Sequence, residues 1–448
     1  MTVQTLVPPS ADPIAVKGYA FGSAGYAWLV VTILSGLQLV SNMERQILSL
    51  TVEPLSRDFH IQDIDVSLLQ GLAFALFYAL VAIPIGWLAD RWRRDRIITI
   101  GTALWVVATV ASMMAKSYSA LFAARLLTGL ADASLLPAAF SLLSDYFPKA
   151  KLAGALGTVT GASFLGTGAS LVFGGLLLKL LPMNGDVVLP LFGAVHGWQL
   201  SFGIMGLPGV ALLAALFAVR EPPRRPGEQE DGAGNGTSMI AFARYTIANR
   251  GYLGTLLGGI ILLVTYQYGL TNWAVSLFVR KFGWTATQIG LVYGLYFMII
   301  GALASIMGGK LCDHLRDNGR RDANFLIPLV ASAVTFPLGL VLALSGSATV
   351  AAIALGGITF CVVIAIGPAM AAIPAFVPNI MRAQFVAVTM MLSTLVGAGG
   401  GPWLVAFFTE AVFHNPLALP YSLAITASLL LLPAATCFYF GARVARRL

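Results

Sequence analysis

The chain has 448 residues, of which 58% are hydrophobic and only 10% are charged, and its mean hydropathy is +0.84. Soluble proteins contain about 25% charged residues, so the composition excludes a soluble domain and predicts an integral membrane protein. The net charge of +8 does not indicate a nucleic-acid partner, because 20 of the 27 Lys and Arg residues fall in alternate loops, which is how membrane orientation is encoded.

Residues 1–26 lack a basic segment followed by a short apolar core, so we expect a loose cytoplasmic tail without a removable signal. Twelve apolar runs follow, and each meets the roughly 20 residues that a membrane-spanning helix needs. They lie near residues 27–50, 67–89, 97–115, 118–143, 152–178, 198–219, 251–278, 287–312, 324–345, 348–371, 381–412 and 418–441.

A dense charge cluster from Gly86 to Arg96 separates the second and third runs, and it predicts a short turn between two membrane helices. A degraded copy lies 223 residues downstream, with Gly309, Leu311 and Asp313 in the places of Gly86, Leu88 and Asp90. The repeat predicts an all-α membrane protein with twelve transmembrane helices in two pseudo-symmetric six-helix bundles. We expect a tail at 1–26, one bundle at 27–220, a cytoplasmic linker at 221–249 and a second bundle at 250–448.

The loops give the orientation. Twenty Lys and Arg residues lie on the side of both termini and five on the other, which predicts cytoplasmic termini. Short loops and the lack of an evident sorting signal favour a bacterial inner membrane. The long outer loop at 179–197 either rests on the interface or caps an entrance, or is a plain variable loop.

An enzyme is not expected. Gly309-Lys310 resembles the end of a phosphate-binding loop, but Ala304 and Leu311 occupy the positions that need Gly and Ser or Thr. The four histidines have no metal-ligand spacing. We therefore predict no cofactor and no metal, and transport that is driven by a gradient.

Four charged residues lie inside the predicted spans, where each costs a few kcal/mol and usually has a function. Asp132 lies near the middle of the fourth span, and Arg125 lies seven residues earlier on the same face. Glu44 and Arg45 lie in the outer third of the first span, at about the depth of Arg125. The two spans are therefore expected to share a charge network. The alternative is a purely structural buried ion pair.

The second half lacks such charges and offers aromatic and weakly polar residues instead. A cavity between the halves would have one charged and one apolar wall, which suits an amphiphile with a charged head. Packing against lipid or neighbouring helices is the alternative. The candidate cavity residues are Asn42 in the first half and Tyr266, Tyr268, Asn272, Trp273, Phe297, Met390 and Ser393 in the second.

The charge cluster and its copy resemble the signature loop of the major facilitator superfamily, and the resemblance extends from Ala27 to Arg447. In that family the loop helps to latch the halves together on the cytoplasmic side. The resemblance implies this role for Asp90, Arg91 and Arg94 after Gly86, and for Asp313 in the copy, where His314 replaces the usual Arg.

Within the superfamily the chain is most similar to the spinster group of lysolipid transporters. The likeness lies in Asn42-Met43-Glu44-Arg45, Asp58-Phe59-His60-Ile61 and Leu68-Leu69-Gln70-Gly71, and in the fourth-span residues Arg125 and Asp132. Glu44 and Asp132 replace the group's usual Asp and Glu. The resemblance implies proton-coupled transport of lysophospholipid-like or sphingoid substrates, whereas related branches move small organic anions or drugs.

We predict alternating access by a monomer in the lipid bilayer, with protons as the coupling ion. Asp132 is the first candidate for the proton carrier and Glu44 the second. Arg45 and Arg125 are the expected counter-ions and headgroup ligands. A membrane receptor is disfavoured because the chain has no sizeable extramembrane domain.

Overall fold

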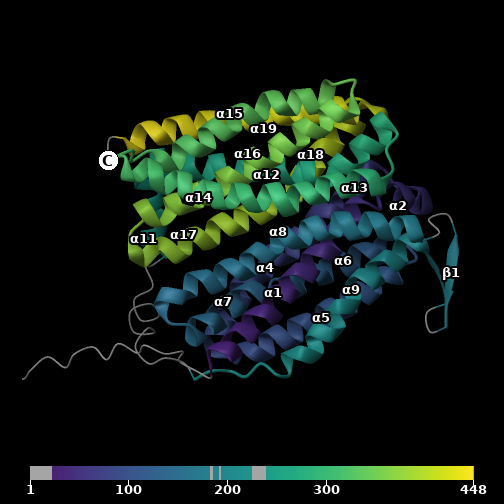
Figure 1. The fold of residues 1–448 in the computed structure, drawn as a ribbon, viewed down its shortest axis with the longest axis horizontal. Helices are drawn as coiled ribbons and strands as arrows, with labels where there is room; N and C mark the ends of the chain where they lie inside the picture. The colour runs from purple at the N-terminus through teal and green to yellow at the C-terminus, as the bar shows by residue number, and fades with distance from the viewer. Residues whose placement is uncertain (1–22, 182–184, 191–192, 224–238, 447–448) are drawn as a thin grey trace, which may run out of the picture.

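The computed structural model describes residues 23–181, 185–190, 193–223 and 239–446. Twelve helical segments in these ranges are long and apolar enough to cross a membrane. They run side by side in two groups, with the N-terminal elements in the lower group and the C-terminal elements in the upper group of Figure 1. The predicted all-α fold with twelve spans in two halves is confirmed.

The bounds of the elements follow the predicted spans closely. In chain order, the first half comprises α1 (Ala24–Gln46), η1 (Ile47–Ser49), α2 (Val52–Phe59), α3 (Asp63–Ser67), η2 (Leu68–Leu72), α4 (Ala73–Arg91), α5 (Arg94–Met113), α6 (Tyr118–Asp132), α7 (Leu135–Tyr146), α8 (Lys149–Leu180), β1 (Asp186–Leu189), β2 (Gly193–His196) and α9 (Gly197–Leu216). The second half comprises α11 (Met239–Ala248), α12 (Arg250–Phe282), α13 (Ala286–Leu295), η3 (Tyr296–Gly301), α14 (Ala302–Asp317), α15 (Ala323–Leu344), α16 (Ala348–Phe376), α17 (Asn379–Leu392), η4 (Ser393–Ala398), α18 (Gly399–Phe407), η5 (Phe408–Val412), η6 (Pro416–Ala418) and α19 (Leu419–Ala445).

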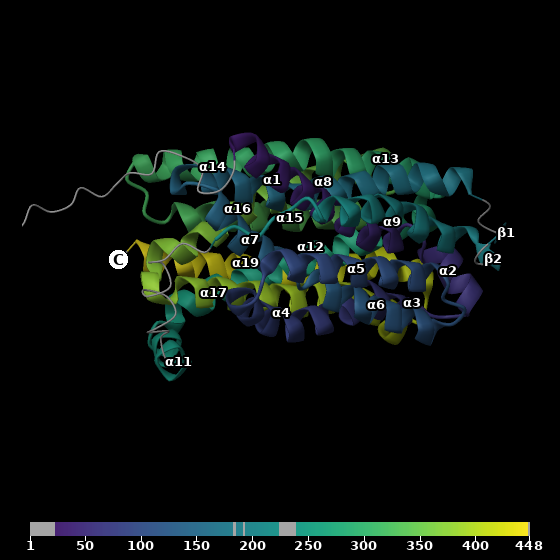
Figure 2. The same cartoon turned by 90° about the horizontal axis from the view of Figure 1, so that it is seen from below.

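The side on which α1 begins and α19 ends is called the terminal side below, and the other is called the opposite side. The opposite side carries an antiparallel hairpin of β1 and β2, in which Asp186 pairs with His196, at the right of Figure 1. This hairpin occupies the predicted long loop. On the terminal side, α11 projects from the helix bundle at the lower left of Figure 2.

The predicted linker contains more structure than its polar composition indicated. α11 forms within it and packs on α17, with the rings of Phe242 and Phe385 4.6 Å apart. Residues 224–238 of the linker lie outside the described part of the chain. The domain boundaries therefore stay a prediction.

The fourth span is broken in mid-membrane. α6 ends at Asp132 and α7 begins at Leu135, with a turn at Ala133 and Ser134. Pro137 explains the break, because its ring lacks an N–H donor and clashes with the carbonyl four residues earlier. The break places the carboxyl group of Asp132 at a helix end instead of inside a continuous helix.

Glycines bring the backbones of the two halves into direct contact. A Cβ on Gly71 would lie 2.2 Å from the carbonyl oxygen of Ala398, and one on Gly294 would lie 2.6 Å from that of Gly168. Any larger side chain would push the halves apart. In contrast, a Cβ on Gly154 in the terminal part of α8 would meet no atom within 4 Å, so this part of the helix borders open space.

Polar contacts hold the halves together on the opposite side. Arg280 of α12 donates to both carboxyl oxygens of Asp63 at 2.5 and 2.7 Å and to Glu53 at 2.7 Å. Glu410, also of the second half, accepts hydrogen bonds from the backbone N–H groups of Asp63 and Ile64 at the start of α3. We call Arg280, Asp63, Glu53 and Glu410 the clasp. It joins the two halves on the opposite side.

Candidate functional site

A buried ion pair joins the first and fourth spans. Arg125 of α6 is 2% exposed and pairs with Glu44 of α1, which is fully buried. Arg125 also donates to the Ser112 hydroxyl at 3.0 Å and lies over the Phe202 ring at 5.1 Å. Buried charges need such partners, because an isolated one pays the full cost of losing water. The predicted contact between the first and fourth spans is thus a direct ion pair, and whether this pair is functional or purely structural stays open to experiment.

Arg45 has a different environment from Arg125, although the two lie at similar depth. It is partly exposed, and it donates a hydrogen bond to the uncharged side chain of Asn42. Its guanidinium lies 4.7 Å from the centre of the Phe74 ring, which stacks on Tyr78 at 5.5 Å. Arg45 therefore differs from Arg125 in being partly exposed and in having no direct ion pair among the described residues, although its charge still acts on the nearby Asp132.

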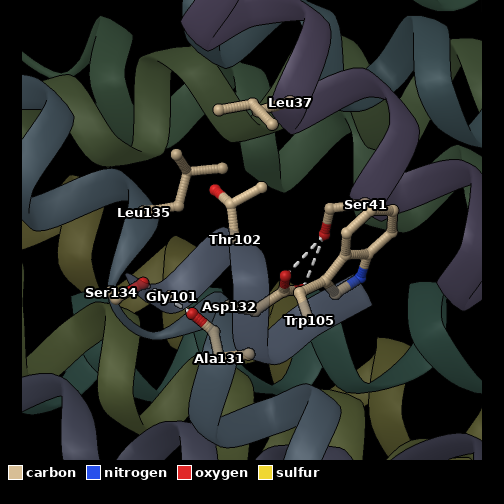
Figure 3. A pocket seen from close by; sticks show the side chains of 9 residues that line it. All are labelled: Leu37, Ser41, Gly101, Thr102, Trp105, Ala131, Asp132, Ser134 and Leu135. Atoms are coloured by element: carbon tan, nitrogen blue, oxygen red, sulfur yellow. Dashed lines mark hydrogen bonds between the residues drawn. The ribbon is translucent and has the colours of Figure 1, made fainter. Parts of the chain in front are cut away.

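Asp132 sits at the helix break, and its carboxylate is held by Ser41 of α1. The Ser41 hydroxyl lies 2.7 Å from both carboxyl oxygens and points directly at them in Figure 3. Beside them is a pocket of about 10 Å³, lined by Thr102 and Trp105 among others, which is about the volume of one water. The indole N–H of Trp105 is buried without a partner among the described residues. The pocket is mainly apolar, but the polar groups of Ser41, Thr102 and Asp132 in its lining could bind one water.

Tyr78 connects this group to the second half. Its hydroxyl lies within electrostatic range of Asp132 and Arg45, and of Tyr268 on α12. Tyr268 is itself partly exposed. Tyr78 was absent from the predicted site, although its spacing of four residues from Phe74 places both rings on one helix face, a signal that the sequence contained.

Three other aromatic residues predicted for the cavity are buried in this arrangement of the helices, and their role in a cavity stays a prediction. Tyr266, Trp273 and Phe297 are 2%, 0% and 4% exposed. The indole N–H of Trp273 donates to the carbonyl of Pro402 at 3.0 Å, which ties α12 to α18. The reason is helical geometry, since Tyr266 and Tyr268 are two residues apart and point to different faces of α12.

The remaining predicted cavity residues divide between the interior and the surface. Asn272 is 8% exposed and donates to the backbone carbonyl of Tyr268 at 2.9 Å. Ser393 is also 8% exposed, and its hydroxyl is unpartnered among the described residues. Met390 is 50% exposed. Asn272 thus supports the helix turn that carries Tyr268.

The predicted latch residues on the terminal side have separate environments. Arg94 is buried and pairs with Asp145 of α7 at 2.5 Å and with Glu221, the first residue of the predicted linker, at 2.7 Å, so neither ion pair joins it to the second bundle. Arg91 is exposed and stacks on Trp87 at 4.1 Å. Sequence reasoning missed Asp145 and Glu221, which lie far along the chain from Arg94.

The other latch positions add little to this arrangement. The Asp90 backbone lies in the last turn of α4, while its side chain lies outside those described. A Cβ on Gly86 would border open space, and Asp313 is exposed. A latch between the halves stays a prediction.

Comparisons with known proteins agree with this fold. The family model described as Major Facilitator Superfamily matches residues 34–402. The chain is 25% identical over 437 residues to an MFS-type efflux pump of Mycolicibacterium smegmatis, with 94% of each chain covered. It is 27% identical over 451 residues to protein spinster homolog 1 of Homo sapiens, covering 94% of this chain and 79% of that one.

A solved structure has the same fold. It is a bacterial homolog to the human lysosomal transporter spinster in an inward-facing and unoccupied conformation. It matches with a TM-score of 0.82 at 23% identity and covers 95% of this chain and 99% of that chain. The resemblance predicted from the sequence motifs is confirmed.

Proposed function

The chain belongs to the Major Facilitator Superfamily, and we propose that it moves amphiphilic lipids with a phosphate-bearing headgroup, of the lysophospholipid type, in exchange or together with protons. Family and fold indicate a transporter related to the spinster proteins and not an enzyme. The main support for the proposal is that two arginines at similar depth have different surroundings. Arg125 is neutralised by Glu44, whereas Arg45 remains partly exposed beside aromatic rings.

Arg45 is the proposed headgroup ligand. A guanidinium matches the geometry of a phosphate with parallel N–H donors, and it keeps its charge at any physiological pH. Asn42 orients one edge of the Arg45 guanidinium, because its side-chain oxygen accepts a hydrogen bond from it. Phe74 and Tyr78 on one side, with Tyr268 from the other half, supply an aromatic boundary for the first part of an acyl or sphingoid chain.

Asp132 is the proposed proton carrier in preference to Glu44. Glu44 is fully buried in its pair with Arg125, so protonating it would leave that arginine without a counter-charge. Asp132 is held by the neutral hydroxyl of Ser41 and lies within electrostatic range of Arg45. A nearby guanidinium favours a charged carboxyl group, and burial disfavours it. A phosphate that engages Arg45 would therefore promote protonation of Asp132, which couples the two ligands.

The proposal includes alternating access, in which opening of the clasp exposes the site to the opposite side while the terminal side closes. We further propose that the terminal side is cytoplasmic, as the distribution of Lys and Arg favours, that the membrane is a bacterial inner membrane and that the unit is a monomer.

A second candidate is the efflux of drugs or small organic anions. The similarity to an efflux pump over 94% of both chains favours it. Arg45 would then hold the anionic group of a compact substrate, and the aromatic boundary would select its shape.

Transport into proteoliposomes separates the candidates. We expect uptake of a lysophospholipid that responds to an imposed pH gradient, that falls at least tenfold in Arg45→Gln and that loses its pH response in Asp132→Asn. Lys179→Gln, an exposed change on the opposite side, should behave as the wild type. Uptake of organic anions without any lysophospholipid uptake would reject the first candidate. Unchanged lysophospholipid uptake by Arg45→Gln would reject the assigned headgroup ligand.

A further inference from the structure

An open pocket of about 470 Å³ on the terminal side lies outside the proposed transport site. It is lined by Gly319, Arg320, Arg321, Asp322 and Arg446. Gly319 adopts a left-handed conformation with φ of +80°, which only glycine adopts without strain, and the turn there reverses the chain between α14 and α15. The turn brings two consecutive arginines next to the end of α19.

A buried carboxylate organises these arginines. The Asp322 side chain is 3% exposed, and its Oδ2 atom accepts a hydrogen bond from Nε of Arg446 at 2.7 Å. Its Oδ1 atom lies 3.6 Å from Nε of Arg320. The side chains of Arg320 and Arg446 are 47% and 56% exposed, so each pairs with the buried carboxylate and is still accessible from outside. The pocket lining contains three arginines and one aspartate and therefore carries a net positive charge.

The pocket lies at the depth of lipid headgroups. The neighbouring spans end at Asp317 and Ala445, and the next begins at Ala323, so the arginines stand just beyond the hydrocarbon boundary. Tyr439, two turns earlier on α19, is 43% exposed and lies 4.8 Å from the guanidinium of Arg443. An exposed tyrosine at this position is typical of the aromatic belt at the membrane surface.

We propose that this pocket binds the phosphate group of an anionic phospholipid from the adjacent leaflet. Arginine is suited to this ligand because its planar fork donates two parallel hydrogen bonds to phosphate oxygens. Basic residues that serve only to orient the chain in the membrane need no fixed geometry. Here the buried Asp322 joins Arg320 to Arg446, 126 positions apart in the sequence, and preorganises them. Free phosphate offers the same chemistry, but the depth of the pocket favours a lipid.

Lipid binding to the full chain in a neutral detergent tests the proposal by native mass spectrometry, with dioleoylphosphatidylglycerol as the probe and dioleoylphosphatidylcholine as the reference. We expect preferential binding of the anionic lipid. Arg320→Gln/Arg321→Gln should bind it about 30-fold more weakly, since each surface arginine contributes about fivefold. Arg93→Gln/Arg96→Gln removes the same charge from exposed positions of the other half and should retain wild-type affinity. Equal losses in both double variants would overturn the proposed site.

A second variant distinguishes a preorganised binding site from general electrostatic attraction. Asp322→Asn raises the net charge, so general attraction predicts tighter binding of phosphatidylglycerol. The proposed site predicts weaker binding, because Arg320 and Arg446 lose their common anchor. Tighter binding would therefore refute the proposal. Inorganic phosphate at millimolar concentration should not displace the lipid, and full displacement would assign the pocket to a soluble phosphate compound instead.

Discussion

The clasp predicts that one substitution that removes a charge but keeps the side-chain shape opens the opposite side of the molecule. Asp63→Asn preserves the shape of the side chain and the backbone N–H groups that bind Glu410, but it removes the charge that faces Arg280. In the closed arrangement the side chains of Arg280 and Asp63 are only 11% and 5% exposed. The substitution therefore leaves a largely buried guanidinium with Glu53 as its remaining acidic partner in the clasp, and Glu53 is 38% exposed.

The size of the effect follows from this burial. Removing one partner of a buried ion pair costs about 3–5 kcal/mol, because the other charge stays out of water. The lower end applies here, since Glu53 still compensates part of the charge. A loss of about 3 kcal/mol in the closed state alone shifts the ratio of closed to open molecules by roughly 150-fold. In the open state Arg280 and Asp63 are both hydrated, so the substitution costs little there.

Double electron–electron resonance measures this shift. Spin labels at Lys116→Cys and Gly346→Cys, both exposed on the opposite side of separate halves, are placed in a background where the three cysteines are Ser. Asp63→Asn should populate a longer interspin distance. Asp186→Asn, which removes an exposed acid from a pair within the first half, should not. Identical distance distributions for wild type and Asp63→Asn would mean that helix packing, and not the clasp, closes this side.

Three further outcomes follow from single contacts. Ser41→Ala should shift the pH dependence of transport, because Asp132 loses its hydroxyl partner; an unchanged pH profile would contradict the proposed positioning. Gly71→Ala should lower the melting temperature, because its Cβ would overlap a carbonyl oxygen of the other half. Such overpacking costs about 1–3 kcal/mol. Gly154→Ala, whose Cβ would lie in open space, should leave the melting temperature unchanged. Arg125→Gln should destabilise the fold by about 3–5 kcal/mol in denaturant unfolding, since it leaves a fully buried carboxylate unpaired; a cost below 1 kcal/mol would argue against a structural pair.

The sequence predicted the span count, and it gave an expected depth for each charge, because both depend on one-dimensional quantities. An apolar run of sufficient length must cross the bilayer as a helix, and the position of Asp132 or Glu44 within its run gives its depth. The approach of the first and fourth spans was also foreseeable. Two buried charges of opposite sign at equal depth are stable only when they meet, as Glu44 and Arg125 do.

The sequence could not say which side chain faces which neighbour. Glu44 and Arg45 are adjacent, so they point about 100° apart on one helix, and only the packing of α1 against α6 decides which one is buried. The same ambiguity leaves the role of Tyr266 and Trp273 in a cavity a prediction. The clasp was missed for another reason. Asp63 and Arg280 are 217 residues apart. Each lies near a helix end, where charged residues are common and give no sign of a specific partner.

The break in the fourth span links the proton site to movement of the helices. α6 and α7 are separate helices around Pro137, so the two parts can tilt with respect to each other without breaking a continuous hydrogen-bond ladder. α6 is anchored by the buried pair of Arg125, and α7 by the pair between Asp145 and Arg94. A carboxyl group at the junction can therefore change its distance from Arg45 while both buried pairs stay intact. Asp132 occupies that junction, whereas Glu44 can change its charge only by breaking one of the anchors, and this difference supports the proposal that Asp132 carries the proton.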